Sequence, residues 1–412
     1  MSEFTLTTLL DPVGIESFFE KYWERSPLHL ARNDPHYYHP LLCAADIDAI
    51  ISHGDGRYPA IRLAKGGAFF AAEAYTRDVH YGDDVFDGVP DVEKIFSEYL
   101  SGATVTLPAL HRTWQPLGRL CSELERQFTH LVHANAYVTP ANAAGFTAHY
   151  DTHEVFILQI AGAKQWRIYT PPVELPHRSQ IFSPERDVPR REPLAELNLS
   201  AGNLLYLPRG YIHSTSTSSI FSAHVTVGIT VYTWVELAAE LLQGCIADPR
   251  FRRALPAGFA SHPGTNQLLA SELRRLIDSW IEAAEFDQIV ASFMQRVQAA
   301  RSRGRGTFRA DVSAIGPRTV LRVASQRQYA LAEETDHVVV VVDGRRVVLP
   351  LAVKPALQTI FAMDPVCALD LDGALSLDVK VALARYLYGL GVLTAVDPPS
   401  APCSSTAQVT SG

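Results

Sequence analysis

The sequence predicts a mixed α+β fold, because its hydrophobic pattern changes twice along the 412 residues. Up to about residue 233, strand-like segments rich in β-branched and aromatic residues alternate with short helices, one of them around Asp91 to Leu100. Apolar residues then recur at helical spacing, and a β-hairpin with two helices follows. The expected domains are 1–233, rich in strands; 234–306, helical; 307–397, hairpin and helices; and 398–412, a tail of disorder-like composition.

One strand-like segment of the first domain carries metal-binding side chains. Residues Ala148 to Gln159 predict a strand, because they include β-branched and aromatic residues and neither Pro nor Gly. Residues two apart share a face of a strand, so His149 and Asp151 emerge side by side. A short apolar run and a Pro/Gly turn precede His213 and can bring it beside the pair in a closed β-sandwich. Two His and one carboxylate form the facial triad that favours Fe(II). His-X-Asp tripeptides are also common where no metal binds, so the neighbouring residues decide whether this one is a metal site.

Lys164 supplies that context. It lies in the run Gly162 to Tyr169, which predicts the next strand, and is one of six lysines in a chain with thirty arginines. Lysine is almost never fully buried without a partner. A buried ammonium needs an anion, and a bound dicarboxylate would supply one.

Five spaced motifs occur in order along the first domain: Asn135-Ala136-Tyr137, Gly145-Phe146, His149-Tyr150-Asp151, Gly162-X-Lys164-X-Trp166 and Pro208-X-Gly210-X-X-His213. Together they resemble the JmjC-type ribosomal oxygenases, which are cupin-fold enzymes. Residues 18–28 are similar to that family's N-terminal signature, and the resemblance extends to about residue 396. It implies a double-stranded β-helix (the cupin/JmjC jelly roll), then a helical dimerisation domain and a C-terminal winged helix.

The resemblance also implies oxygenase chemistry that depends on Fe(II) and 2-oxoglutarate, with O2 as co-substrate. His149, Asp151 and His213 would hold the iron, with no catalytic residue beyond these ligands. Lys164 would pair with the distal carboxylate of 2-oxoglutarate.

Further contacts follow from the same resemblance. Asn135 and Thr226 would lie by the cofactor and Tyr137 in the substrate pocket, although Thr and Tyr are also ordinary strand residues. His153 and His224 are expected to be hydrogen-bonded structural groups, because the facial triad is already complete.

The helical region carries two apolar stripes. Their residues are Leu268, Leu269, Leu273, Leu276, Ile277 and Trp280, and then Phe286, Ile289, Val290, Phe293 and Val297. A small helical insert has difficulty burying such stripes alone, so they form either a subunit interface or a surface packed on the oxygenase domain. The resemblance favours a homodimer.

The third domain begins with a strong hairpin signal. Two apolar runs, 338–342 and 345–349, flank Asp343-Gly344, which predicts a type I′ turn. Helices are expected near 355–361 and 376–390, with Ser376 as N-cap and Gly391 as C′ residue. These elements fit a winged helix. Four acidic residues, Asp364, Asp370, Asp372 and Asp378, favour protein interaction over DNA binding.

Composition narrows the function classes. The formal net charge of −8 argues against broad nucleic-acid binding and favours a basic partner such as a ribosomal protein tail. The arginines at 301, 303, 305 and 309 could contact RNA, but a solvated linker between domains is the favoured interpretation. Five scattered cysteines without a CxxC pair indicate reduced thiols and a cytoplasmic protein. No apolar run approaches the ~20 residues of a membrane span, and the N-terminus lacks the positive start of a secretory signal.

Three functions are compatible with these observations. The first is hydroxylation of a His or Arg side chain of a ribosomal protein. The second is the same chemistry on another peptide, for instance a natural-product precursor. The third is a non-catalytic cupin-like binding module, against which the intact triad and Lys164 argue.

Overall fold

The computed structural model describes residues 4–53, 58–187, 192–261, 265–300, 312–324, 329–333, 336–342 and 345–396. Its chain divides into two compact units between Glu236 and Leu237. The predicted turn at Asp343-Gly344, the arginine-rich linker from 301 to 309 and the tail 398–412 lie outside the described residues. Among the described helices, none has the length and apolar character to span a bilayer.

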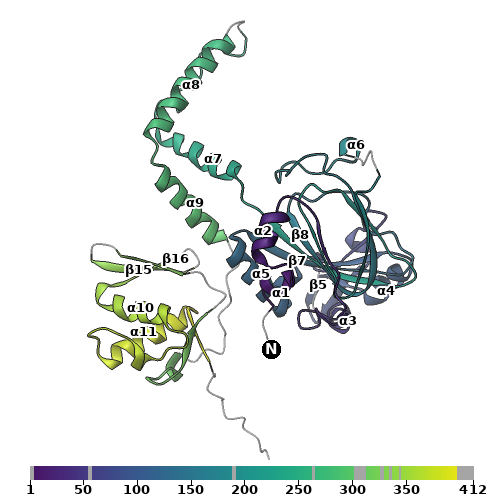
Figure 1. Cartoon of the computed structure of the whole chain (residues 1–412), viewed down its shortest axis with the longest axis horizontal. Coiled ribbons are helices and arrows are strands. Elements are labelled where there is room, and N and C mark those ends of the chain that lie inside the picture. The colour runs from purple at the N-terminus through teal and green to yellow at the C-terminus, as the bar shows by residue number, and fades with distance from the viewer. Residues whose placement is uncertain are drawn as a thin grey trace, which may run out of the picture. The chain divides into compact units, whose positions relative to one another are not determined.

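The first unit is built on one large antiparallel sheet (Figure 1). Its strands, in spatial order, are β1 (Leu28–Leu30), β10 (Leu204–Leu207), β8 (Glu154–Ile168), β12 (Ser222–Thr230), β7 (Leu131–Thr139), β6 (Thr104–Leu107), β2 (Arg62–Lys65) and β3 (Ala68–Phe69). A separate hairpin pairs β4 (Thr76–Tyr81) with β5 (Asp84–Pro90).

Strand β8 belongs to two sheets. Its first half pairs with β10 and β12, whereas residues 163–168 pair with β9 (Ala195–Ser200) and β11 (His213–Ser216). Gly162 makes this passage possible, since it has a φ of +64° and a Cβ there would lie 1.8 Å from the carbonyl oxygen of Phe221. The two-sheet arrangement agrees with the predicted β-sandwich.

The predicted strand limits in this region are wrong. The sequence suggested two strands, 148–159 and 162–169, but the structure has one strand that begins at Glu154 and bends at Gly162. Residues 148–153 precede it, and only His149 forms an isolated bridge, to His213. A glycine reads as a strand break in sequence, while here it lets the backbone continue through a tight approach.

Helices cover one side of the large sheet. α1 (Leu6–Leu10), α2 (Ile15–Lys21) and α5 (Gln115–Phe128) lie together there in Figure 1 and share one core with the strands. Phe18 packs its ring 5.5 Å from Phe156 and 4.9 Å from Tyr206. The remaining helices are α3 (Ala44–His53), α4 (Val92–Leu100) and the short α6 (Pro184–Asp187). α4 confirms the helix predicted around 91–100, with Asp91 as its N-cap.

The second unit begins within a helical region. α7 (Trp234–Gln243) starts in the first unit, and α8 (Thr265–Ala283) and α9 (Phe286–Ala300) follow. All residues of α8 are described, and none of them is buried.

The C-terminal part combines strands and two helices around one core. β13 (Leu321–Val323) pairs with β17 (Leu393–Ala395), and β14 (Tyr329–Glu333), β15 (His337–Val342) and β16 (Arg345–Pro350) form a second sheet. The strands β15 and β16 are the predicted hairpin. α10 (Lys354–Ala362) and α11 (Leu377–Gly389) confirm the two predicted helices, and Ser376 caps α11 by accepting from Val379 N–H. Gly391 has the left-handed φ of +70° expected of a C′ residue.

Candidate metal centre and adjacent cavity

The structure brings His149, Asp151 and His213 together where the segment before β8 passes the start of β11. His149 and His213 form an antiparallel bridge, with N···O distances of 3.1 and 2.8 Å. Gly210 N–H donates to the Asp151 carbonyl at 3.0 Å, which holds the carboxylate segment beside the turn before His213. One ligand atom from each of the three residues lies within 4.8 Å of the others.

Backbone carbonyls fix the tautomer of both imidazoles. Nδ1 of His149 lies 2.7 Å from the Thr147 carbonyl, and Nδ1 of His213 lies 3.1 Å from the Tyr211 carbonyl. A carbonyl oxygen only accepts, so Nδ1–H donates in each ring. Nε2 then carries the free lone pair, as a metal ligand requires. The Nε2 of His213 lies 3.8 Å from Oδ2 of Asp151.

Electrostatics give these groups the protonation states that a metal needs. Burial raises the pKa of Asp151, but the nearby His153, His213 and His149 outweigh it and leave that pKa below its ordinary value. Burial, assisted by His149, lowers the pKa of His213 to about 4. At neutral pH the carboxylate is therefore ionised and the His213 ring is neutral. Neutral imidazole and carboxylate together are the donor set of a facial-triad iron site.

A cavity of about 140 Å³ adjoins the three residues. Its lining residues are Phe69, Asn135, Tyr137, Phe146, His149, Asp151, His153, Val155, Lys164, Trp166, His213, Thr215, His224 and Thr226. All seven residues singled out from the sequence, the three triad residues and Lys164, Asn135, Tyr137 and Thr226, border this one space.

Lys164 is buried in the wall of the cavity, with 1% of its surface exposed. Its Nζ donates to Thr139 Oγ1 at 3.0 Å, and Thr139 shares a 3.0 Å hydrogen bond with the Thr104 hydroxyl. No carboxylate among the described residues forms an ion pair with it. Burial lowers the pKa of Lys164 to about 7. An ammonium held at a cavity wall without an anion fits one end of a dicarboxylate ligand.

Two further polar atoms in the wall lack partners. Trp166 Nε1 and His224 Nδ1 are buried and have no hydrogen-bond partner within the described part of the chain. We expected His224 to be a hydrogen-bonded structural group, and for its Nδ1 that expectation is wrong. The ring instead stacks on Tyr137, with centroids 5.0 Å apart. Buried polar atoms without a hydrogen-bond partner are rare in proteins unless a ligand or a water molecule supplies the partner.

Asn135, Tyr137 and Thr226 lie on the neighbouring strands β7 and β12, where Thr226 faces Asn135 across the ladder. Burial raises the pKa of the Tyr137 hydroxyl, and its hydrogen bonds with Thr226 and Asn135 oppose the rise. Asn135 also accepts from Ala109 N–H at 2.9 Å through Oδ1. The three side chains therefore form one connected group at the cavity. Their assignment to the cofactor or the substrate stays a prediction.

Tyr137, Phe146 and Phe69 form an aromatic wall of the cavity, and Phe69 was not among the residues predicted from the sequence. Phe146 stands edge-on to Tyr137 at 5.8 Å and lies 5.9 Å from Phe69. Arg62 stacks over Phe69 at 3.7 Å. Phe69 lies on β3 and Arg62 on β2, and both strands are far in sequence from the triad, so no local pattern places them at the cavity. The backbone packs closely beside this wall, since a Cβ at Gly67 would lie 2.7 Å from the Thr147 hydroxyl, a contact that only the fold reveals.

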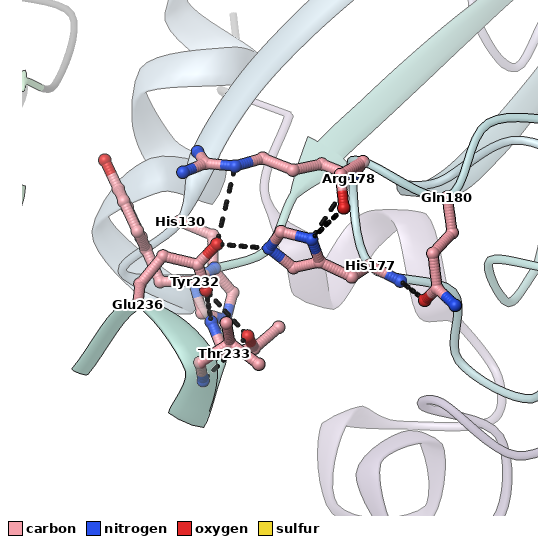
Figure 2. Close-up of polar contacts among 9 residues, drawn as sticks. His130, His177, Arg178, Gln180, Tyr232, Thr233 and Glu236 are labelled. Atoms are coloured by element: carbon pink, nitrogen blue, oxygen red, sulfur yellow. Dashed lines mark hydrogen bonds and ion pairs between the residues drawn. The ribbon is translucent and has the colours of Figure 1, made fainter. Parts of the chain in front are cut away.

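Tyr150 lies between His149 and Asp151 in sequence, and its side chain is fixed by a loop outside the cavity. Its hydroxyl donates to the Gln180 carbonyl at 2.9 Å. Residues 177–180 are in turn fixed to the first turn of α7, as Figure 2 shows. His177 Nε2 donates to Glu236 Oε1 at 2.8 Å, while Glu236 Oε2 accepts from the backbone and hydroxyl of Thr233 at 2.8 and 2.6 Å.

Known proteins share this architecture. Residues 110–237 match the family model described as the JmjC domain. Over its full length the chain is similar to the solved structure of YcfD, a ribosomal oxygenase from Escherichia coli, which it matches over 96% of this chain and 100% of that one with a TM-score of 0.52 and 16% identity. That likeness confirms the expected cupin-type fold.

Two relatives are similar in sequence. "Ribosomal oxygenase 1" of Gallus gallus is 31% identical over 65% of this chain and 44% of its own length. The "bifunctional lysine-specific demethylase and histidyl-hydroxylase NO66" of Caenorhabditis elegans is 27% identical over 71% of this chain and 42% of its own length. This chain thus spans less than half the length of either relative. The chain therefore carries a JmjC domain at residues 110–237, is similar in sequence to ribosomal oxygenases and shares the fold of YcfD.

Proposed function

We propose that this protein is an Fe(II)- and 2-oxoglutarate-dependent oxygenase that hydroxylates a protein side chain. The observation that carries the proposal is the shared cavity, which the three metal-binding side chains and the unpaired ammonium of Lys164 both face. A structure of YcfD in complex with cobalt and 2-oxoglutarate has the same fold, with a TM-score of 0.50 and 15% identity. When bound, iron and 2-oxoglutarate supply the activation of O2 and the insertion of oxygen into a C–H bond.

Each residue has a defined task in this proposal. His149, Asp151 and His213 hold the metal on one side and leave positions open toward the cavity. Lys164 pairs with the distal carboxylate of 2-oxoglutarate, and Thr139 holds the ammonium in place. The buried ring of Trp166 separates this end of the cavity from solvent.

The substrate we propose is a His or Arg side chain of a ribosomal protein. The names of the relatives support it, and so does the aromatic wall of Tyr137, Phe146 and Phe69, which suits a flat side chain. The net charge of −8 favours a basic partner. The same chemistry on another peptide or a natural-product precursor is the alternative. A non-catalytic module is less well supported, because it would have no use for a buried unpaired ammonium.

We further propose that the remaining domains serve assembly, within the bounds 234–306 for dimerisation, 307–397 for a winged helix used in protein interaction, and 398–412 for a disordered tail. Exposed apolar side chains on α8, including Leu268 at 73% and Leu273 at 54%, support a homodimer. The hairpin β15–β16 and the helices α10 and α11 share one core, as a winged helix requires. The cysteines within the described residues are free thiols, which supports a cytoplasmic protein.

The test is an anaerobic titration of the purified protein with Fe(II) and 2-oxoglutarate, which should produce a visible charge-transfer band. Admission of O2 should then yield succinate. The variant His149→Ala should lose both signals. His80→Ala, at an exposed histidine of β4, is the matched control and should keep both signals. A band that survives in His149→Ala, or its absence from folded wild-type protein, would refute the proposal.

A further inference from the structure

A buried charged network joins the two segments that carry the proposed metal ligands. Arg209 lies four residues before His213 and Glu154 three residues after Asp151. The two side chains are 5% and 0% exposed, and Arg209 Nη1 donates to Glu154 Oε1 at 2.8 Å. The same Nη1 forms an ion pair with Glu24, from the segment that follows α2.

Two tyrosines close the network around these charges. The Tyr206 hydroxyl donates to Glu154 Oε2 and accepts from Glu24 N–H at 3.0 Å. The Tyr211 hydroxyl donates to the Arg25 carbonyl at 2.9 Å. Glu24 has a left-handed φ of +56°, which a non-glycine residue adopts only when its surroundings impose it. The segment around Glu24 is therefore shaped to hold both sides of the turn that leads to His213.

Stability alone does not explain this network. Burying an ion pair costs about as much desolvation free energy as the pair returns, and well-packed apolar residues stabilise as well or better. The buried Nε of Arg209 also has no hydrogen-bond partner in the described part of the chain. What an apolar replacement cannot reproduce is the pair of directional charged hydrogen bonds that Arg209 Nη1 donates, one to Glu154 and one to Glu24, which fixes the separation and orientation of these groups.

We propose that Arg209 is a positioning residue that sets the place of His213 relative to Asp151, with Glu154 and Glu24 as its two anchors. The inference rests on the proposed metal site. Besides this network, the His149–His213 bridge and the Gly210–Asp151 hydrogen bond join the two ligand segments. Those contacts join backbone atoms, whereas Arg209 Nη1 connects the turn before His213 to the side chains of Glu24 and of Glu154, the first residue of β8.

The test compares Mn(II) affinity and thermal stability in four full-length variants. Arg209→Met should weaken Mn(II) binding by about 10- to 100-fold, the range found for partners of metal ligands. Its unfolding temperature should also fall, because Glu154 is left buried without a cation. Arg209→Met/Glu154→Gln removes both charges, so it should recover stability while its Mn(II) affinity stays weak. Arg209→Lys should recover Mn(II) binding only in part. Arg167→Met, an exposed arginine of β8 paired with Glu196, is the control and should match wild type.

The outcomes separate this inference from the proposed function. Recovery of Mn(II) affinity together with stability in the double variant would show that Arg209 only neutralises a buried charge, and would overturn the positioning role. Wild-type affinity in Arg209→Met would do the same. Wild-type protein that binds neither Mn(II) nor Fe(II) would instead reject the metal site itself, and the positioning role with it.

Discussion

His149 and His213 hydrogen-bond to each other through their backbones, at 3.1 and 2.8 Å, and each ring is anchored by its own Nδ1 to a nearby carbonyl. The bridge sets the distance between the two imidazoles, and the anchors point each Nε2 at the same space. Contacts within the protein itself therefore set the positions of both imidazoles. Asp151 completes the triad with its only carboxylate, whose negative charge an imidazole cannot supply.

Replacement of Asp151 by Asn should remove metal binding while it preserves the fold. The amide keeps the size of the side chain but not its charge, so Mn(II) affinity should fall by more than about 100-fold, beyond the effect of an outer-shell change. Titration with Mn(II), followed by the loss of the free-ion electron paramagnetic resonance signal, measures this affinity. Circular dichroism should be unchanged. Affinity within tenfold of wild type would exclude Asp151 as a ligand.

Lys164→Met should change ligand affinity and stability in opposite directions. Loss of the ammonium should weaken 2-oxoglutarate binding by about 2–5 kcal/mol, the cost of truncating one partner of a buried charge pair. Without ligand, the variant should unfold at a higher temperature, because a buried unpaired cation is removed. Calorimetric titration and thermal unfolding give the two values. Lys65→Met, at an exposed lysine, is the control. An unchanged affinity for 2-oxoglutarate would show that Lys164 does not bind its distal carboxylate.

Binding of 2-oxoglutarate should weaken as pH rises above neutrality. The pKa of Lys164 is lowered to about 7 by burial, so the free protein holds the ammonium below that pH and loses it above. A dicarboxylate needs the charged form, and its affinity should fall by about tenfold per pH unit beyond 7. The same shift makes the unliganded protein more stable as pH rises from 7 toward 10. Dissociation constants from pH 6.5 to 9 test this, and Lys164→Met should show no such slope.

The sequence could predict which chemical groups meet at the site but not how the backbone brings them there. His149, Asp151 and Lys164 lie within one short stretch, so local spacing already favours a shared surface. Gly162 marked a strand break in sequence, yet its missing Cβ is what lets β8 continue past Phe221 into the second sheet. That approach depends on a strand distant in sequence, which no local pattern contains.

The rest of the cavity wall was hidden for the same reason. Phe69 lines the cavity and Arg62 stacks on its ring, although both lie far from the triad in sequence. The pairing of β2 with β6 brings their segment there. The ammonium of Lys164 meets Thr139 on β7, a contact set by sheet order and not by spacing. Side chains fixed by long-range pairing need the fold before they can be assigned.

The contact of His177 with Glu236 should make the protein sensitive to acid (Figure 2). Burial raises the pKa of Glu236, but hydrogen bonds from Thr233 and His177 outweigh it and lower that pKa to about 2. Its stabilising effect is complete above pH 4.5, the ordinary value, and is lost as pH falls toward 2. Glu236→Gln should therefore cost about 1–3 kcal/mol at pH 7 and less near pH 2. Denaturant unfolding at both pH values measures it, and an equal cost at both would contradict the ionic contribution.

The exposed apolar side chains of α8 should hold two chains together. Leu268 and Leu273 are 73% and 54% exposed, although they belong to the stripe that repeats at helical spacing. A charge there would be buried in a dimer at a cost of several kcal/mol but would remain solvated in a monomer. Leu268→Glu/Leu273→Glu should therefore halve the mass seen by light scattering, while Gln267→Glu, which adds one negative charge at a polar position of the helix, should leave a dimer. A dimer that survives the double substitution would place the interface elsewhere, and a monomeric wild type would leave α8 without the proposed partner.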